Sequence, residues 1–122
     1  MSRILMVDDD RSVSGSVSRA LARAGHDVLL AADGKEGLRM VRVARPDLVV
    51  TDVLMPEMDG VELIIALRKE APELPVIAVS GGGRLPKELM LDTASALGVV
   101  YTVEKPFDLE HFLAVVDQAL GG

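Results

Sequence analysis

The sequence predicts a three-layer α/β domain in which helices cover both faces of a parallel β-sheet. Short apolar runs of strand length alternate five times with longer segments whose apolar residues recur at helical spacing. The runs are apolar at successive positions, which is typical of strands that are buried on both faces. Because a helix follows each strand, right-handed crossovers between parallel strands are expected.

The first half of the chain contains three of the predicted strands and two of the predicted helices. We expect strands over residues 4–7, 28–31 and 48–51, and helices over about 11–24 and 34–44. Gly25 stands where a left-handed C-cap would end the first helix. Asp33 has the side chain of an N-cap for the second helix, and Pro46 stops that helix.

The second half contains two further strands and three further helices. A helix that carries Leu63, Ile64 and Leu67 ends before Pro72. Strands are expected over residues 76–79 and about 99–103, and helices over about 87–97 and from 109 onwards. Asp108 precedes this last helix at a position typical of an N-cap.

Length and composition limit the class of protein. The 122 residues, 49% of them hydrophobic, suggest one domain over residues 1–122, and the initial Met favours a stand-alone protein. The net charge of −6 and the lack of a basic stripe predict no direct contact with nucleic acid. No apolar run is long enough for a membrane span or signal peptide, so a cytoplasmic location is expected.

Acidic residues follow two of the apolar runs. Asp8, Asp9 and Asp10 come directly after the first run, and Asp52 comes directly after the third. Ligands of such sheets lie beyond the carboxyl ends of the strands, so neighbouring strands would bring these acids together. Two carboxylates about 5 Å apart repel by roughly 3 kcal/mol at an effective dielectric near 20. The acids therefore predict a site for a positive ion.

Two more polar side chains are expected at the same edge of the sheet. Ser80 ends the fourth predicted strand, and Lys105 follows the fifth. Acids with a divalent cation, a hydroxyl and an ammonium group suit a phosphoryl group, and oxygen ligands of this kind suit Mg²⁺. A carboxylate can itself be the nucleophile and form an aspartyl phosphate.

The chain resembles the receiver domains of two-component response regulators over its full length. The matching stretches are ILMVDD at 4–9, DLVVTDVLMPEMDG at 47–60, PVIAVS at 75–80 and KPF at 105–107. The resemblance implies a flavodoxin-like, doubly wound (βα)5 fold with strand order 2-1-3-4-5. It also implies a phosphorylation-dependent signalling switch in a phosphorelay, not a conventional turnover enzyme.

The resemblance implies roles for the acidic residues. Asp52 would be the phosphoacceptor and would take a phosphoryl group from a phosphohistidine on a sensor histidine kinase or phosphotransfer protein. Asp9, Asp52 and the backbone carbonyl of Leu54 would bind Mg²⁺. Asp8 would act on the metal mostly through water.

The resemblance also implies how the switch would work. Lys105 and Ser80 would bind phosphoryl oxygens, and the Lys105-Pro106 bond would be cis. A downstream protein would bind the face made by the fourth helix, the fifth strand and the fifth helix, on a monomer or a phosphorylation-dependent dimer. An aromatic residue often stands three places before the lysine in this family. Here that position is Thr102, and Tyr101 lies one place earlier, so the switch residue stays open.

Two other functions compete with the switch. The Asp-x-Asp spacing of Asp8 and Asp10 suggests a small Mg²⁺-dependent aspartyl-phosphate hydrolase of the haloacid dehalogenase type. Such enzymes continue with glycine and threonine, whereas Arg11 and Ser12 follow here, so Asp10 is better explained as a helix N-cap. A flavin carrier would need a hydroxyl-rich phosphate loop, and three acids there would repel the phosphate.

Overall fold

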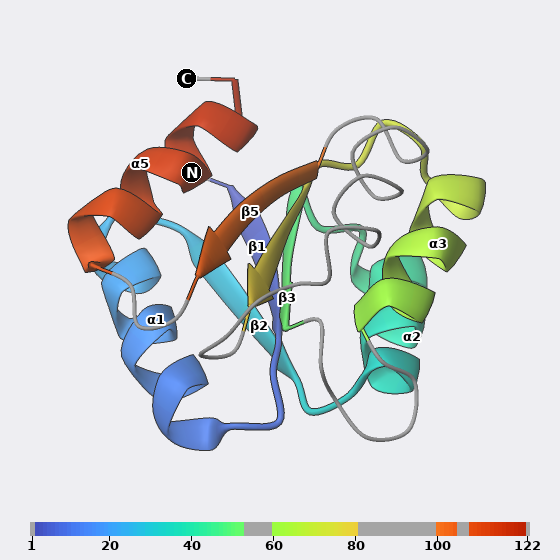
Figure 1. Cartoon of the computed structure of the whole chain (residues 1–122), viewed down its shortest axis with the longest axis horizontal. Helices are drawn as coiled ribbons and strands as arrows, with labels where there is room; N and C mark the ends of the chain where they lie inside the picture. The colour runs from blue at the N-terminus through green and yellow to red at the C-terminus, as the bar shows by residue number, and fades with distance from the viewer. Residues whose placement is uncertain (1, 53–59, 81–99, 105–107, 122) are drawn as a thin grey trace.

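Five parallel strands form the centre of the computed structural model, with helices on both faces (Figure 1). The structure describes residues 2–52, 60–80, 100–104 and 108–121. The strands are β1 (Arg3–Val7), β2 (Asp27–Ala31), β3 (Leu48–Asp52), β4 (Val76–Ser80) and β5 (Val100–Glu104). The described helices are α1 (Arg11–Arg23), α2 (Gly34–Ala44), α3 (Gly60–Glu70) and α5 (Leu109–Ala119). The helix predicted over residues 87–97 lies outside the described part of the chain.

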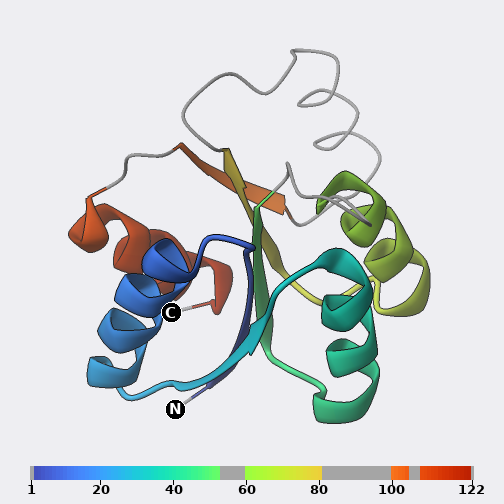
Figure 2. The same ribbon diagram turned by 90° about the horizontal axis from the view of Figure 1, so that it is seen from below.

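The strand order is β2-β1-β3-β4-β5, and every neighbouring pair is parallel. Helices α1 and α5 lie on one face of the sheet, and α2 and α3 lie on the other (Figure 2). The predicted fold class and strand order are confirmed. Because the chain moves to opposite sides of β1 for β2 and β3, the order reverses at β1, and ligands of such sheets bind at this switch point.

The apolar runs are continuous because each strand contributes to two cores. In β1, Ile4 and Met6 pack into the cluster beneath α1 and α5, while Leu5 and Val7 pack into the cluster beneath α2 and α3. All four side chains have 0% exposure. An alternating polar pattern would have buried polar groups on one of these faces, which is unfavourable without hydrogen-bond partners.

The predicted helix ends are confirmed where the structure describes them. The Asp33 side chain accepts a hydrogen bond from the Glu36 backbone N–H at 2.9 Å, and the Glu36 carboxylate accepts one from the Ala32 N–H at 3.3 Å. This reciprocal arrangement satisfies two backbone donors at the start of α2. Gly25 has a φ of 94°, the left-handed conformation expected after α1.

The strand bounds differ slightly from the prediction. Asp52 is the last residue of β3 and not the first residue after it, and β5 ends at Glu104, one residue later than expected. Each shift adds a polar residue to a strand whose predicted end was the end of its apolar run. No described helix is long and apolar enough to cross a bilayer.

Two helical glycines should respond in opposite ways to substitution by alanine. A Cβ on Gly37 would lie 3.0 Å from Cγ2 of Val7, whereas a Cβ on Gly15 would meet no atom within 4 Å. Gly15→Ala should raise the free energy of unfolding by about 0.5–1 kcal/mol, because alanine favours the helix. Gly37→Ala should lower it, because overpacking costs about 1–3 kcal/mol. Urea denaturation measures both changes, and an equal gain for the two variants would contradict the packing described here.

Candidate functional site

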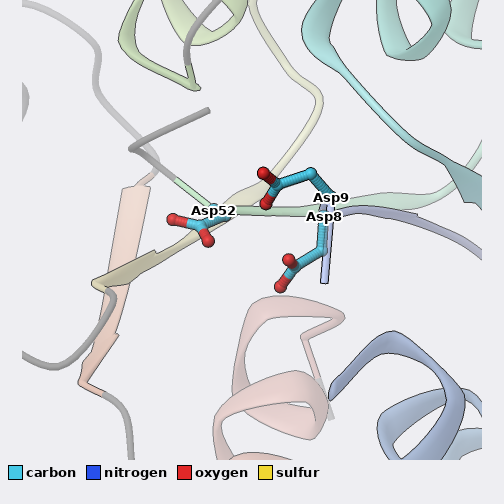
Figure 3. A group of neighbouring side chains, drawn as sticks. All are labelled: Asp8, Asp9 and Asp52. Atoms are coloured by element: carbon cyan, nitrogen blue, oxygen red, sulfur yellow. The ribbon is translucent and has the colours of Figure 1, made fainter. Parts of the chain in front are cut away.

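Three aspartates converge at the carboxyl ends of β1 and β3. The two strands are neighbours in register, with Val7 opposite Thr51, so the chain places Asp8 and Asp52 side by side. One carboxylate oxygen from each of Asp8, Asp9 and Asp52 lies within 4.8 Å of the others. Figure 3 shows the three side chains reaching from the two strand ends toward a common space. The predicted convergence of these acids at the switch point is confirmed.

Backbone contacts hold the first of these acids in place. Asp8 is only 3% exposed. Its Oδ1 accepts a hydrogen bond from the Asp10 N–H at 2.8 Å, and its own N–H donates to the Ala31 carbonyl of β2 at 3.1 Å. A buried carboxylate needs such partners, since burying it without them is costly. The carboxylate of Asp8 is therefore already oriented within the site.

The residue before Asp52 also contributes a buried polar contact. Thr51 has 0% exposure, and its hydroxyl donates to the backbone carbonyl of Asp52 at 2.9 Å. Asp52 itself is 6% exposed, whereas Asp9 is open to solvent. Thr51 was not among the predicted site residues. The available signal was a lone hydroxyl in an otherwise apolar run, directly before the acid.

The carboxylates form a set of donors that fits a hard cation. At 4.8 Å, each pair of charges repels by about 1 kcal/mol in bulk water and by about 3.5 kcal/mol at an effective dielectric of 20. Mg²⁺ prefers oxygen ligands at about 2.1 Å in octahedral geometry, which places ligand oxygens about 3 to 4 Å apart. The carboxylate oxygens, within 4.8 Å of one another, are close to that spacing. The exposed position of Asp9 leaves access for the water molecules that Mg²⁺ retains.

The structure does not describe every predicted site residue. Leu54, Lys105 and the Lys105-Pro106 bond lie outside the described residues, as does the side chain of Ser80. The backbone of Ser80 is described: Asp52 pairs with Val79, so Ser80 is one position further along the neighbouring strand. Asp10 is not one of the three converging acids. Its carbonyl accepts the Ser14 N–H at 3.0 Å, as expected at an N-cap position.

A pocket of about 410 Å³ adjoins the acid cluster on the side of β2. Asp8 lines both features, and Ser14, Gly15, Leu30 and Glu36 are among the other lining residues. Ser14 is buried on α1, and Leu30 is about half exposed on the edge strand. No periodic sequence pattern identified this pocket, because its walls come from three separate elements.

Tyr101 and Thr102 lie at successive positions of β5, and side chains alternate between the faces of a strand. Tyr101 packs against the cluster that contains Phe112 and Val116, beneath α1 and α5. The backbone of Thr102 pairs with that of Ala78, and its side chain lies outside the described residues. The choice of switch residue between the two positions stays a prediction.

Known proteins resemble the whole of this chain. The family profile of the response regulator receiver domain matches residues 4–117. Response regulator MprA of Mycolicibacterium vanbaalenii is 41% identical over 113 residues, which cover 92% of this chain and 47% of that protein. The chemotaxis protein CheY4 of Vibrio cholerae superposes with a TM-score of 0.87 at 32% identity, over 98% of both chains. A CheY-like receiver domain from Methanospirillum hungatei gives 0.90 at 29% identity, over 99% of this chain and 94% of the other.

The chain spans about half the length of the curated relatives that it matches. The charge of one domain carries no information about the other half of such relatives. The expectation of no contact with nucleic acid is therefore not supported, and it is not retained.

Replacing one of the three aspartates should distinguish two effects of the cluster on the free energy of unfolding. One is the repulsion among its charges, and the other is the binding of metal. Without divalent ions, Asp9→Asn should raise the free energy of unfolding by roughly 1 kcal/mol, because like-charge contacts are lost. With Mg²⁺ at 100 times its dissociation constant, the wild-type chain should gain about 2.7 kcal/mol, and the variant much less. Urea denaturation in EDTA and in Mg²⁺ measures both effects.

The matched control for this comparison is Asp117→Asn, which removes an exposed acid from α5. It should gain as much from Mg²⁺ as the wild type does. An equal gain for Asp9→Asn would contradict a metal site at the three aspartates.

Proposed function

Since this chain belongs to the family of response regulator receiver domains, we propose that Asp52 is the phosphoacceptor of its signalling switch. A phosphoacceptor switch is the function that the family match supports, and the comparisons give no support to the alternative of a hydrolase. A receiver domain is typically a switch and not a turnover enzyme. The transfer of a phosphoryl group to a residue of the domain itself is the part that we propose.

The observation that carries the proposal is the convergence of Asp8, Asp9 and Asp52 within 4.8 Å. Asp52 stands at the end of a central strand, buried at its base, with its carboxylate at the shared edge of the sheet. We propose that Mg²⁺ is held by Asp52, by its neighbours Asp8 and Asp9, and by the backbone carbonyl of Leu54. When bound, Mg²⁺ offsets the negative charge that builds up between an aspartate and an incoming phosphoryl group.

The proposed reaction is transfer of a phosphoryl group from a phosphohistidine. An oxygen of Asp52 forms a bond to phosphorus while the phosphorus–nitrogen bond of the donor breaks. The departing imidazole nitrogen takes a proton from solvent, and the product is an aspartyl phosphate. Little else is required of the protein beyond positioning and charge neutralisation.

Two further side chains have proposed roles in holding the product. Lys105 would bind one phosphoryl oxygen as a cation, and Ser80 would donate its hydroxyl to another. The described backbone supports the proximity of Ser80, since it follows Val79, the partner of Asp52. Tyr101 is partly buried against the cluster beneath α1 and α5, so we assign it a packing role.

The proposed partners follow from the phosphoryl transfer. The donor would be a sensor histidine kinase or a phosphotransfer protein that presents a phosphohistidine to the edge containing Asp52. The receiver of the signal would be a protein that binds the face containing β5 and α5. A cytoplasmic location, where such donors have access, remains a prediction.

Incubation with acetyl phosphate and Mg²⁺ should add one phosphoryl group to the chain. Intact-mass spectrometry detects the addition, and EDTA should prevent it because the carboxylates then repel the donor. Asp52→Asn should abolish the addition, since the amide is not a nucleophile of comparable strength.

The control is Asp10→Asn, which keeps a side chain suited to an N-cap and lies outside the converging trio. It should be phosphorylated as readily as the wild type. Phosphorylation that persists in Asp52→Asn would place the acceptor at another residue and refute the proposal.

A further inference from the structure

The outer side of α2 carries a stripe of cations. Lys35, Arg39 and Arg42 stand four and then three residues apart, so they lie along one side of the helix. All three are exposed, whereas the buried residues of α2 lie on a different side. Residues 34–45 contain four cations and one acid, a charge of +3 in a chain whose net charge is −6. The outer side of α2 is therefore basic on an otherwise acidic molecule.

An acid of α3 offsets only one of these cations. Nε of Arg42 donates to Glu70 at 3.0 Å, and a second guanidinium nitrogen bonds the other carboxylate oxygen. This contact holds the pKa of the Glu70 carboxyl below its ordinary value. Arg39 and Lys69 have no ion-pair partner among the residues that the structure describes. Positive charge therefore remains on this surface, and carboxylates of another molecule would offset it.

A partly apolar groove runs beside the stripe. It has a volume of about 360 Å³, and Leu38, Ile65 and Ala66 are among the residues that line it. Ile65 is 44% exposed, and Val43, one helical turn after Arg39, is 80% exposed. The two helices lie side by side over the same side of the sheet, away from α1 and α5 (Figure 2). We refer to the stripe and the groove together as the α2–α3 face.

We propose that the α2–α3 face binds an acidic amphipathic helix of another protein. Helices that bind in grooves place their apolar side against the apolar lining, and residues one turn apart act as anchors. Carboxylates of the bound helix would lie over Lys35 and Arg39, and its apolar side chains would contact Leu38 and Ile65. Because α2 has 11 residues, the contact would extend over about 16 Å, or about three helical turns.

The distribution of charge on the face favours this occupant over two others. A second copy of the same face is disfavoured, because both copies would bring a net positive surface to the contact. A nucleic acid offers phosphates to α2 but no apolar side chain for the groove, and the net charge of −6 repels a polyanion. Glu62 lines the groove on α3, so the carboxylates of the bound helix should lie on its α2 side.

The proposed contact does not depend on phosphorylation. None of the residues of the α2–α3 face belongs to the cluster of Asp8, Asp9 and Asp52. Asp52→Asn, which should abolish phosphorylation, should therefore leave binding at this face unchanged. The failure of the proposed contact and the failure of the phosphoacceptor role are thus distinguishable.

A fluorescein-labelled synthetic helix of about 15 residues, with glutamates along one side and leucines along the adjacent side, tests the charge of the face. Fluorescence anisotropy should show binding to the whole chain with a dissociation constant below about 1 mM. Arg39→Glu should weaken this binding roughly threefold to tenfold, because an attraction becomes a repulsion. The matched control is Arg19→Glu, which makes the same change of charge at an exposed cation of α1 and should bind like the wild type.

Two further changes test the apolar part of the contact. Ile65→Ser, and a peptide with serine in place of each leucine, should each weaken binding roughly tenfold. Far-UV circular dichroism shows whether each variant is folded, and amide chemical shifts show whether α2 and α3 are the elements contacted.

Four results would overturn the proposal. They are no binding up to about 1 mM, equal weakening by Arg19→Glu and Arg39→Glu, equal binding of the serine peptide, and displacement of the peptide by a short DNA duplex.

Discussion

Mutual repulsion among three carboxylates is the constraint on which the rest of this site depends. Because β1 and β3 pair in parallel, both strands end at the same edge of the sheet. The carboxylates of Asp8, Asp9 and Asp52 therefore lie close together. The hydrogen bond from the Asp10 N–H holds Asp8 in this arrangement. A cation bound among the three carboxylates would relieve this repulsion, and in the proposed function the same cation would prepare the site for a phosphoryl group. The proposed metal affinity and the proposed phosphoryl acceptance thus share one structural origin.

The fold could be predicted because its determinants are local. Runs such as residues 4–7 are apolar at every position, and only a strand covered on both faces explains that pattern over so short a length. Asp33 and Gly25 mark helix ends through their own backbone chemistry. The predicted end of β3 was one residue short, at Asp52. The last residue of a strand is set by its pairing with the neighbouring strand, and the sequence of one strand does not contain that pairing.

The acids of the site were predicted for a topological reason, whereas their supporting contacts were not. Strand ends share an edge in any parallel sheet, so the positions of Asp8 and Asp52 followed once the strands were assigned. The bond from the Thr51 hydroxyl to the Asp52 carbonyl and the close approach of Gly37 to Val7 depend on distances between atoms.

A crystal structure of the chain with Mg²⁺ and beryllium trifluoride, which mimics a phosphoryl group, would show whether Asp52 accepts such a group beside a bound metal ion. We expect an ion about 2.1 Å from a carboxylate oxygen of both Asp9 and Asp52, and beryllium bonded to the other oxygen of Asp52. Beryllium trifluoride bound to a different residue, or a metal ion held away from the three aspartates, would contradict this expectation.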